Sequence, residues 1–432
     1  MNDLNASTEN NLNWSGFQKT AFRFAFLFFI LNTFPFPISE LPVVGEFIQD
    51  PYENGWDKLV NVAGKIFFGI PEIIIRPNGS GDTTWSWVQL FVIMLLAAIG
   101  CVIWGLLDRK RGNYNALSYL NHIYLRYFLA LTMLTYGFAK VFPSQFGVIN
   151  NYNLYQQVGD MSPMRLLWIF MAYSTKYQFF AGFMECLAGF LLIFRRTTLL
   201  GALISMGVMV NVFVLNMCFD VPVKIFSFML ILIGAYLVAP DFQRLLNFFI
   251  LQKPAAAPPQ YQPVFADKKG LKIGRIVLKV LLILSIIVPI VMQVMDDNDE
   301  PEALLSNFYG RYAVAKHVKN AAEVTVIDTL RWEKLAIDHQ GTKDFMIATN
   351  DMGLRTRMVF VKNDSAKTIT FNTAADSTKY VFSFQQPDTT SLILTGKVGN
   401  DSLYIELLKR KKRDFLLVKR GFHWINEGPF NK

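Results

Sequence analysis

The stretch from Gly182 to Lys224 reads GFMECLAGFLLIFRRTTLLGALISMGVMVNVFVLNMCFDVPVK. It holds two long apolar runs that are separated only by the four residues Arg195-Arg196-Thr197-Thr198. Two such runs on either side of a short basic turn are typical of a transmembrane helical hairpin whose turn faces the cytoplasm. Glu185 then lies inside the membrane, where an ionisable group is costly and indicates a functional site with a partner.

The composition of the whole chain agrees with a membrane location. Of its 432 residues, 52% are hydrophobic and only 17% are charged, which is too apolar for an ordinary soluble protein of this size. The net charge is +9, but many basic residues lie in short segments beside the apolar runs, a positive-inside pattern that requires no nucleic-acid partner. The three cysteines form no CxxC pair, so the sequence predicts neither a zinc site nor a dithiol redox centre.

The apolar runs predict about seven transmembrane helices. They cover residues 17–35, 87–107, 118–142, 177–194, 199–219, 222–239 and 273–295. Because Lys19 and Arg23 begin the first helix, we expect a cytoplasmic amino terminus in a bacterial inner membrane and a carboxyl-terminal part outside the cytoplasm. Asp82 or Thr84 is expected to cap the second helix.

The chain is expected to have six parts, of which the last is not helical. They are a polar tail (1–16), two helices with an external interfacial segment (17–117, segment 36–85), a four-helix core (118–240), a Pro/Ala-rich cytoplasmic linker (241–271), a seventh helix (272–295) and an extracytoplasmic β-domain (296–432). Short alternating segments punctuated by turns predict roughly eight antiparallel strands in this last part, as in a small barrel or sandwich. Its basic run KRKKR at 409–413 is predicted to be a solvated hairpin turn, with anionic lipid or a partner as the alternative.

Two groups of polar residues within the helices are candidate sites. Arg126 and Glu185 both lie about 12 to 14 Å from the cytoplasmic side at 1.5 Å per residue, so we expect them to form an ion pair that either locks two helices together or serves function. The second group lies toward the outer side and is expected to line a pocket for a carbonyl-bearing head group such as a quinone. Its members are Tyr136, Lys140, Asn211, Asn216, Asp220 and Lys224. The alternative is that Asp220 caps the next helix while the lysines extend to lipid phosphates.

Residues 118–240 resemble the DoxX family of bacterial membrane proteins. The resemblance lies in three motifs: Arg126…Tyr136-Gly137-Phe138-Ala139-Lys140, Glu185…Ala188-Gly189, and Arg195-Arg196-Thr197-Thr198…Gly201-Ala202. Members of that family are associated with membrane oxidoreductase systems, including a quinone-reducing thiosulfate dehydrogenase. The resemblance therefore implies a quinone-linked redox subunit.

Three functions remain open from the sequence. A redox subunit would need a bound quinone and a partner protein that carries the redox centre, because no other cofactor motif is evident. A non-catalytic scaffold would span the lipid bilayer and present the β-domain to an envelope partner. A transporter of small solutes or lipids would use Arg126 and Glu185 in a site at the membrane midplane.

Overall fold

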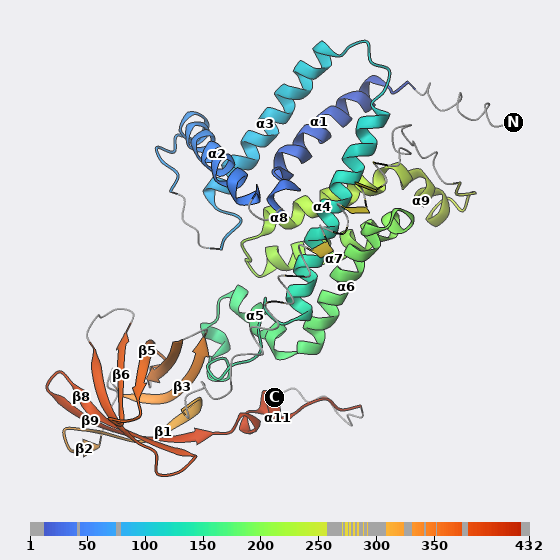
Figure 1. Ribbon diagram of the computed structural model, residues 1–432. Helices are drawn as coiled ribbons and strands as arrows, with labels where there is room; N and C mark the ends of the chain where they lie inside the picture. Colours follow the sequence, from blue (N-terminus) through green and yellow to red (C-terminus); the bar gives the residue numbers. More distant parts are fainter. Residues whose placement is uncertain are drawn as a thin grey trace. The chain divides into compact units, whose positions relative to one another are not determined.

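A computed structural model of the chain describes residues 13–40, 44–74, 79–256, 308–323, 331–340, 343–350, 352–373 and 379–424, with scattered positions between 270 and 292. The chain divides into two compact units (Figure 1). Unit 1 is helical and comprises Met1–Gly147 and Pro163–Met295. Unit 2 comprises Val148–Ser162, which we call the inserted loop, and Asp296–Lys432, which contains a closed antiparallel β-barrel. The predicted fold class, apolar helices followed by a small β-domain, is confirmed.

The helices of unit 1 largely follow the predicted apolar runs. They are α1 (Gly16–Thr33), α2 (Val44–Phe68), α3 (Thr84–Leu107), α4 (Asn115–Val141), α5 (Pro163–Tyr173), α6 (Thr175–Ile193), α7 (Thr198–Cys218), α8 (Lys224–Val238) and α9 (Phe242–Phe249). By length and composition, five described segments can cross a membrane, namely Gly16–Glu40, Thr84–Leu107, Thr175–Ile193, Arg195–Cys218 and Lys224–Phe249. Most of the predicted seventh helix lies outside the described residues.

Helix α4 has 27 residues but is not among those five segments, since polar side chains such as Asn121 and Arg126 interrupt its apolar run. A 3₁₀ turn, Ala239–Asp241, joins α8 to α9. Helix α9 occupies the first residues of the predicted linker, because its apolar residues, such as Phe242, Leu245 and Phe249, recur at helical spacing among polar ones.

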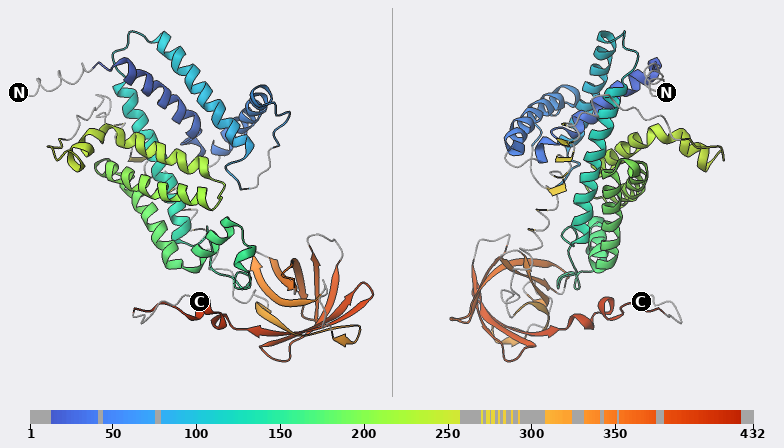
Figure 2. Two further views of the ribbon diagram at one scale, coloured as in Figure 1. Left: turned by 180° about the vertical axis from the view of Figure 1, so that it is seen from behind. Right: turned by 45° about the vertical axis from the view of Figure 1, so that its right-hand side comes forward.

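Helices α4, α6, α7 and α8 pack side by side around one apolar core (Figures 1 and 2). Fully buried leucines and isoleucines from these helices fill it, including Leu125, Leu192 and Ile233. The backbones of α4 and α6 touch, since a Cβ atom on Gly182 would lie 2.5 Å from the carbonyl oxygen of Gly137. Small residues permit this close approach in membrane helices.

In unit 2, strands in which apolar and polar residues alternate form a closed barrel. Its strands are β1 (Gly310–Lys319), β2 (Ala322–Glu323), β3 (Trp332–Gln340), β4 (Lys343–Asn350), β5 (Arg355–Asn363), β6 (Thr368–Thr373), β7 (Tyr380–Gln385), β8 (Ser391–Val398) and β9 (Asp401–Arg410). Neighbouring strands pair in antiparallel order, and β1 also pairs with β9, while the short β2 extends the edge of β1. Buried side chains such as Phe382, Leu394 and Ile405 fill the interior, as expected for eight strands.

The basic run at 409–413 is not a hairpin turn, so that prediction is wrong. Lys409 and Arg410 end the last strand, and the chain continues through a 3₁₀ turn, Lys412–Asp414, into the short helix α11 (Leu416–Lys419). The reason is topological: β9 closes the barrel against β1, so no further strand is needed to pair with it.

Candidate functional site

A buried ion pair joins α4 to α6. The Nζ atom of Lys140 lies 2.7 Å from Oε2 of Glu185, and their side chains are only 8% and 3% exposed. The ammonium group also donates a hydrogen bond to the carbonyl oxygen of Tyr136 at 3.4 Å. Side chains on a helix tilt toward its amino terminus, so on antiparallel helices the two charged groups reach toward each other.

The predicted pair between Arg126 and Glu185 is therefore wrong. Arg126 instead donates to Oγ1 of Thr198 at 3.4 Å, and its guanidinium group lies 4.9 Å from the ring centre of Tyr127. The prediction assumed that the start of the helix with Arg126 and the end of the helix with Glu185 lie at the same depth. In the structure, α4 is eight residues longer than α6, with 27 residues against 19, and Arg126 lies near the level where α6 ends and α7 begins.

Tyr136 forms the accessible edge of the Lys140–Glu185 pair. Its ring centre lies 5.6 Å from the Lys140 ammonium nitrogen and 6.1 Å from the ring of Phe226 on α8. The tyrosine is 42% exposed, whereas the ion pair behind it is buried. Tyr136 and Lys140 thus lie next to each other as predicted, and Glu185 lies beside them as well.

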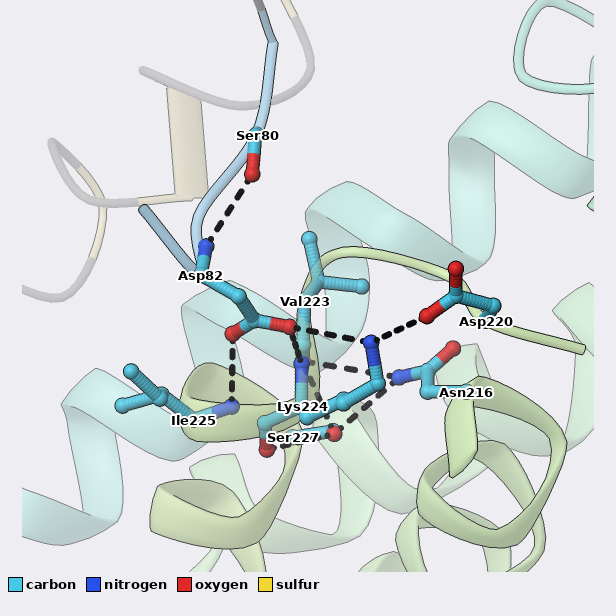
Figure 3. Close-up of polar contacts among 8 residues, drawn as sticks. All are labelled: Ser80, Asp82, Asn216, Asp220, Val223, Lys224, Ile225 and Ser227. Carbon is cyan, nitrogen blue, oxygen red and sulfur yellow. Dashed lines mark hydrogen bonds and ion pairs between the residues drawn. The ribbon is translucent and has the colours of Figure 1, made fainter. Parts of the chain in front are cut away.

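A second polar cluster lies at the start of α8 (Figure 3). The carboxylate of Asp82 accepts hydrogen bonds from the backbone nitrogens of Lys224 at 2.7 Å and Ile225 at 3.0 Å. The Lys224 ammonium group lies 3.7 Å from Asp82 and 3.0 Å from Asp220. Asp82 therefore caps α8, and it does so from the connection that precedes α3.

Two capping predictions are thereby corrected. Asp220 does not cap α8, because its backbone has a φ angle of 51° and its side chain, 84% exposed, turns outward to Lys224. Thr83, and neither Asp82 nor Thr84, caps α3, since its hydroxyl accepts from the backbone nitrogen of Ser86. Asp82 reaches the start of α8 because folding brings two segments together that lie far apart in the sequence.

The two asparagines of the predicted pocket have different surroundings. Asn216 is buried and donates to Oγ of Ser227 at 3.0 Å and to the carbonyl oxygen of Val223 at 3.4 Å. Asn211 is exposed on α7, and among the residues that the structure describes it forms no hydrogen bond with the other candidate residues. The structure therefore brings Asn216, Asp220 and Lys224 together with Asp82, but it does not bring Asn211 into this cluster.

A third polar cluster, which sequence reasoning missed, holds the inserted loop within unit 2. Asp338 on β3 accepts from the backbone nitrogens of Asn151 at 3.1 Å and Tyr152 at 2.9 Å. The side-chain amide of Asn151 donates to the carbonyl oxygen of Ile337 at 2.9 Å and accepts from the guanidinium group of Arg311. Burial raises the pKa of Asp338, although the hydrogen bonds from the loop oppose this shift. The signal in the sequence was an acidic residue, Asp338, that directly follows the apolar residues of a predicted strand.

Among the residues that the structure describes, no group of three histidine, cysteine, aspartate or glutamate side chains is placed to hold a metal ion. The acidic groups described above instead bind lysine ammonium groups and backbone nitrogens.

Comparisons with known proteins identify a relative of part of the chain. No family model matches the chain, and no solved structure matches it. Over 124 residues the chain is 36% identical to the uncharacterized protein YwoB of Bacillus subtilis strain 168, and this region is 29% of the chain and 79% of YwoB. Through this region, the chain belongs to the same family as YwoB.

Proposed function

We propose that the protein is a membrane scaffold that presents its β-barrel to another protein of the cell envelope. In this proposal the helices span the bacterial inner membrane, the amino terminus is cytoplasmic and the barrel is extracytoplasmic. The observation that carries the proposal is the built-in attachment of the inserted loop to the barrel through Asp338, Asn151 and Arg311.

Several charged contacts attach the inserted loop to the barrel. Hydrogen bonds to charged groups contribute about 1.5–3 kcal/mol each, and Asp338 accepts two from the loop backbone. At the far end of the loop, Arg355 forms an ion pair with Asp160 at 2.7 Å. The inserted loop lies in the sequence between α4 and α5, yet it belongs to the barrel unit. The barrel unit is therefore linked to the helices through this loop as well as through the chain that precedes β1, which suits a domain that is presented to a partner.

The polar groups of the helices also support a structural role. Glu185 is paired with Lys140, Asp82 with the start of α8, and Asn216 with Ser227. Each of these polar groups forms a hydrogen bond or an ion pair with another part of the same chain, as expected for residues that specify how helices pack.

Cross-linking and co-purification from native membranes would test the scaffold proposal. Protein that lacks residues 296–432 should lose its envelope partner, whereas Glu185→Gln should lower the yield but leave the partner in proportion to the protein. A finer comparison pairs Asp338→Ala with Asp364→Ala, an exposed residue that follows β5. Only Asp338→Ala should reduce partner recovery. Equal recovery with and without the barrel would contradict the proposal.

A second proposal is a quinone-linked redox subunit, as the DoxX resemblance implies. The observation that favours it is Tyr136, an accessible phenol beside the buried Lys140–Glu185 pair. A quinone ring would pack against this tyrosine, and the electron donor would belong to a partner protein. Purified protein should then contain extractable quinone, and Tyr136→Phe should slow its reduction in the presence of a membrane extract. Quinone-free protein with an unaffected variant would exclude this function.

The transport hypothesis has less support from the geometry. It depends on Arg126 and Glu185 acting in one site, and among the described ion pairs Glu185 is bound to Lys140 instead. Uptake into vesicles that is abolished by both Arg126→Gln and Glu185→Gln would revive it.

A further inference from the structure

The end of the described chain combines dense positive charge with exposed apolar side chains. Residues 409–424, which we call the basic tail, contain seven lysines and arginines and one acidic residue, Asp414. Between and after these charges lie the half-exposed Leu416 and Leu417, then Phe422 at 75% and Trp424 at 91% exposure. Figures 1 and 2 show this segment extending beyond the strands of the barrel after β9.

The start of the basic tail is fixed to its own unit. The ring of Phe415 lies 4.7 Å from the guanidinium group of Arg410 and 5.4 Å from the ring of Tyr155 in the inserted loop. Lys412 donates to the carbonyl oxygen of Ile149 at 3.2 Å, and Asp414 accepts from the backbone nitrogen of Lys411 at 3.0 Å. The exposed residues beyond Phe415 therefore leave the barrel from a defined point.

The side chains beyond this point do not enter the barrel core. The rings of Phe422 and Trp424 contact each other, with ring centres 5.0 Å apart. Exposing two large aromatic rings to water is unfavourable, because the cost grows with the apolar surface that water contacts. The basic tail therefore has the charges and the exposed apolar side chains that bind a negatively charged surface with an apolar layer directly beneath.

We propose that residues 411–424 bind the surface of a bilayer that contains anionic phospholipid. Lysine and arginine side chains bind the phosphate groups, and Leu416, Leu417, Phe422 and Trp424 enter the boundary between head groups and acyl chains. Aromatic side chains favour this boundary, and each basic residue near an anionic surface adds electrostatic attraction. An acidic protein would have to present a matching apolar groove beside its charges, whereas an anionic bilayer always offers a charged surface above an apolar layer.

The experiment uses the full chain in lipid nanodiscs of phosphatidylcholine, with or without phosphatidylglycerol. Trypsin cleavage after Lys419 and Arg420 is followed by mass spectrometry, and cleavage after Lys367, in an exposed turn of the barrel, serves as the internal control. Phosphatidylglycerol should slow cleavage in the basic tail at least tenfold without changing cleavage at Lys367. Added salt should partly restore the cleavage rate, because it screens the charges.

Two sets of substitutions separate lipid binding from other causes. Lys411→Gln, Lys412→Gln and Arg413→Gln together should abolish most of the protection. Phe422→Ser with Trp424→Ser should also reduce it severalfold, although every charge remains. Cleavage rates that are equal in the two kinds of nanodisc would overturn the proposal. Protection that appears only when membrane proteins are added would also overturn it and would indicate a protein partner.

Discussion

Removal of one member of the Lys140–Glu185 pair should destabilise the helical unit more than removal of both. The charged atoms are 2.7 Å apart, and both side chains are almost fully buried. In Lys140→Met, the Glu185 carboxylate would lose the Lys140 ammonium group that it contacts. In Glu185→Leu, Lys140 would retain the weak bond to the carbonyl oxygen of Tyr136 at 3.4 Å and the nearby Tyr136 ring, but no carboxylate among the described ion pairs.

The size of the effect follows from the cost of a buried, unpaired charge. Breaking a buried pair by removal of one partner costs about 3–5 kcal/mol, whereas replacement of both partners by apolar groups is often neutral or stabilising. Each single variant should therefore lose about 3–5 kcal/mol of unfolding free energy, and the double variant Lys140→Met/Glu185→Leu should regain most of it. Lys140 and Glu185 face each other directly across α4 and α6, so their effects cannot be independent.

Unfolding in mixed detergent micelles, followed by far-ultraviolet circular dichroism, would measure these free energies. Asp220→Asn is the matched control, because it removes an ion pair whose carboxylate is largely exposed and because asparagine tolerates a φ angle of 51°. This control should change stability by no more than about 1 kcal/mol. Single variants within that same range, or a double variant whose loss equals the sum of the two, would refute the reasoning.

Three further predictions concern packing, capping and pH. Gly182→Val should force α4 and α6 apart and cost at least about 1–3 kcal/mol in the same unfolding assay, while Gly207→Ala, where a Cβ atom meets nothing within 4 Å, should have little effect. Asp82→Ala should cost about 0.5–2 kcal/mol and speed hydrogen exchange at the amides of Lys224 and Ile225, with Ser86 unchanged. Hydrogen bonds from Thr390 and Ser391 lower the pKa of Asp388 from 3.8 to about 2, so its stabilisation of this turn is complete above pH 3.8 and is lost as the pH falls toward 2. In a pH titration the chemical shift of the Thr390 amide should follow this protonation of Asp388. Asp388→Asn should abolish the pH-dependent change in that shift.

Local patterns in the sequence were sufficient for the class of the protein and for most of its elements. Long apolar runs bounded by basic residues predicted the membrane helices, and alternation predicted the strands of the barrel, because both signals depend only on neighbours along the chain. The hairpin of α6 and α7 and the buried position of Glu185 were evident in this way.

The partners of the buried polar groups were decided only by the tertiary structure. Glu185 binds Lys140 instead of Arg126 because α4 extends past the end of α6, and such an offset between helices is not encoded in either helix alone. Asp82 caps a helix that begins at Lys224, and Asp338 binds a loop that begins at Val148. In each case the packing of apolar surfaces sets the register first, and the polar atoms then bind the groups that this register brings within reach.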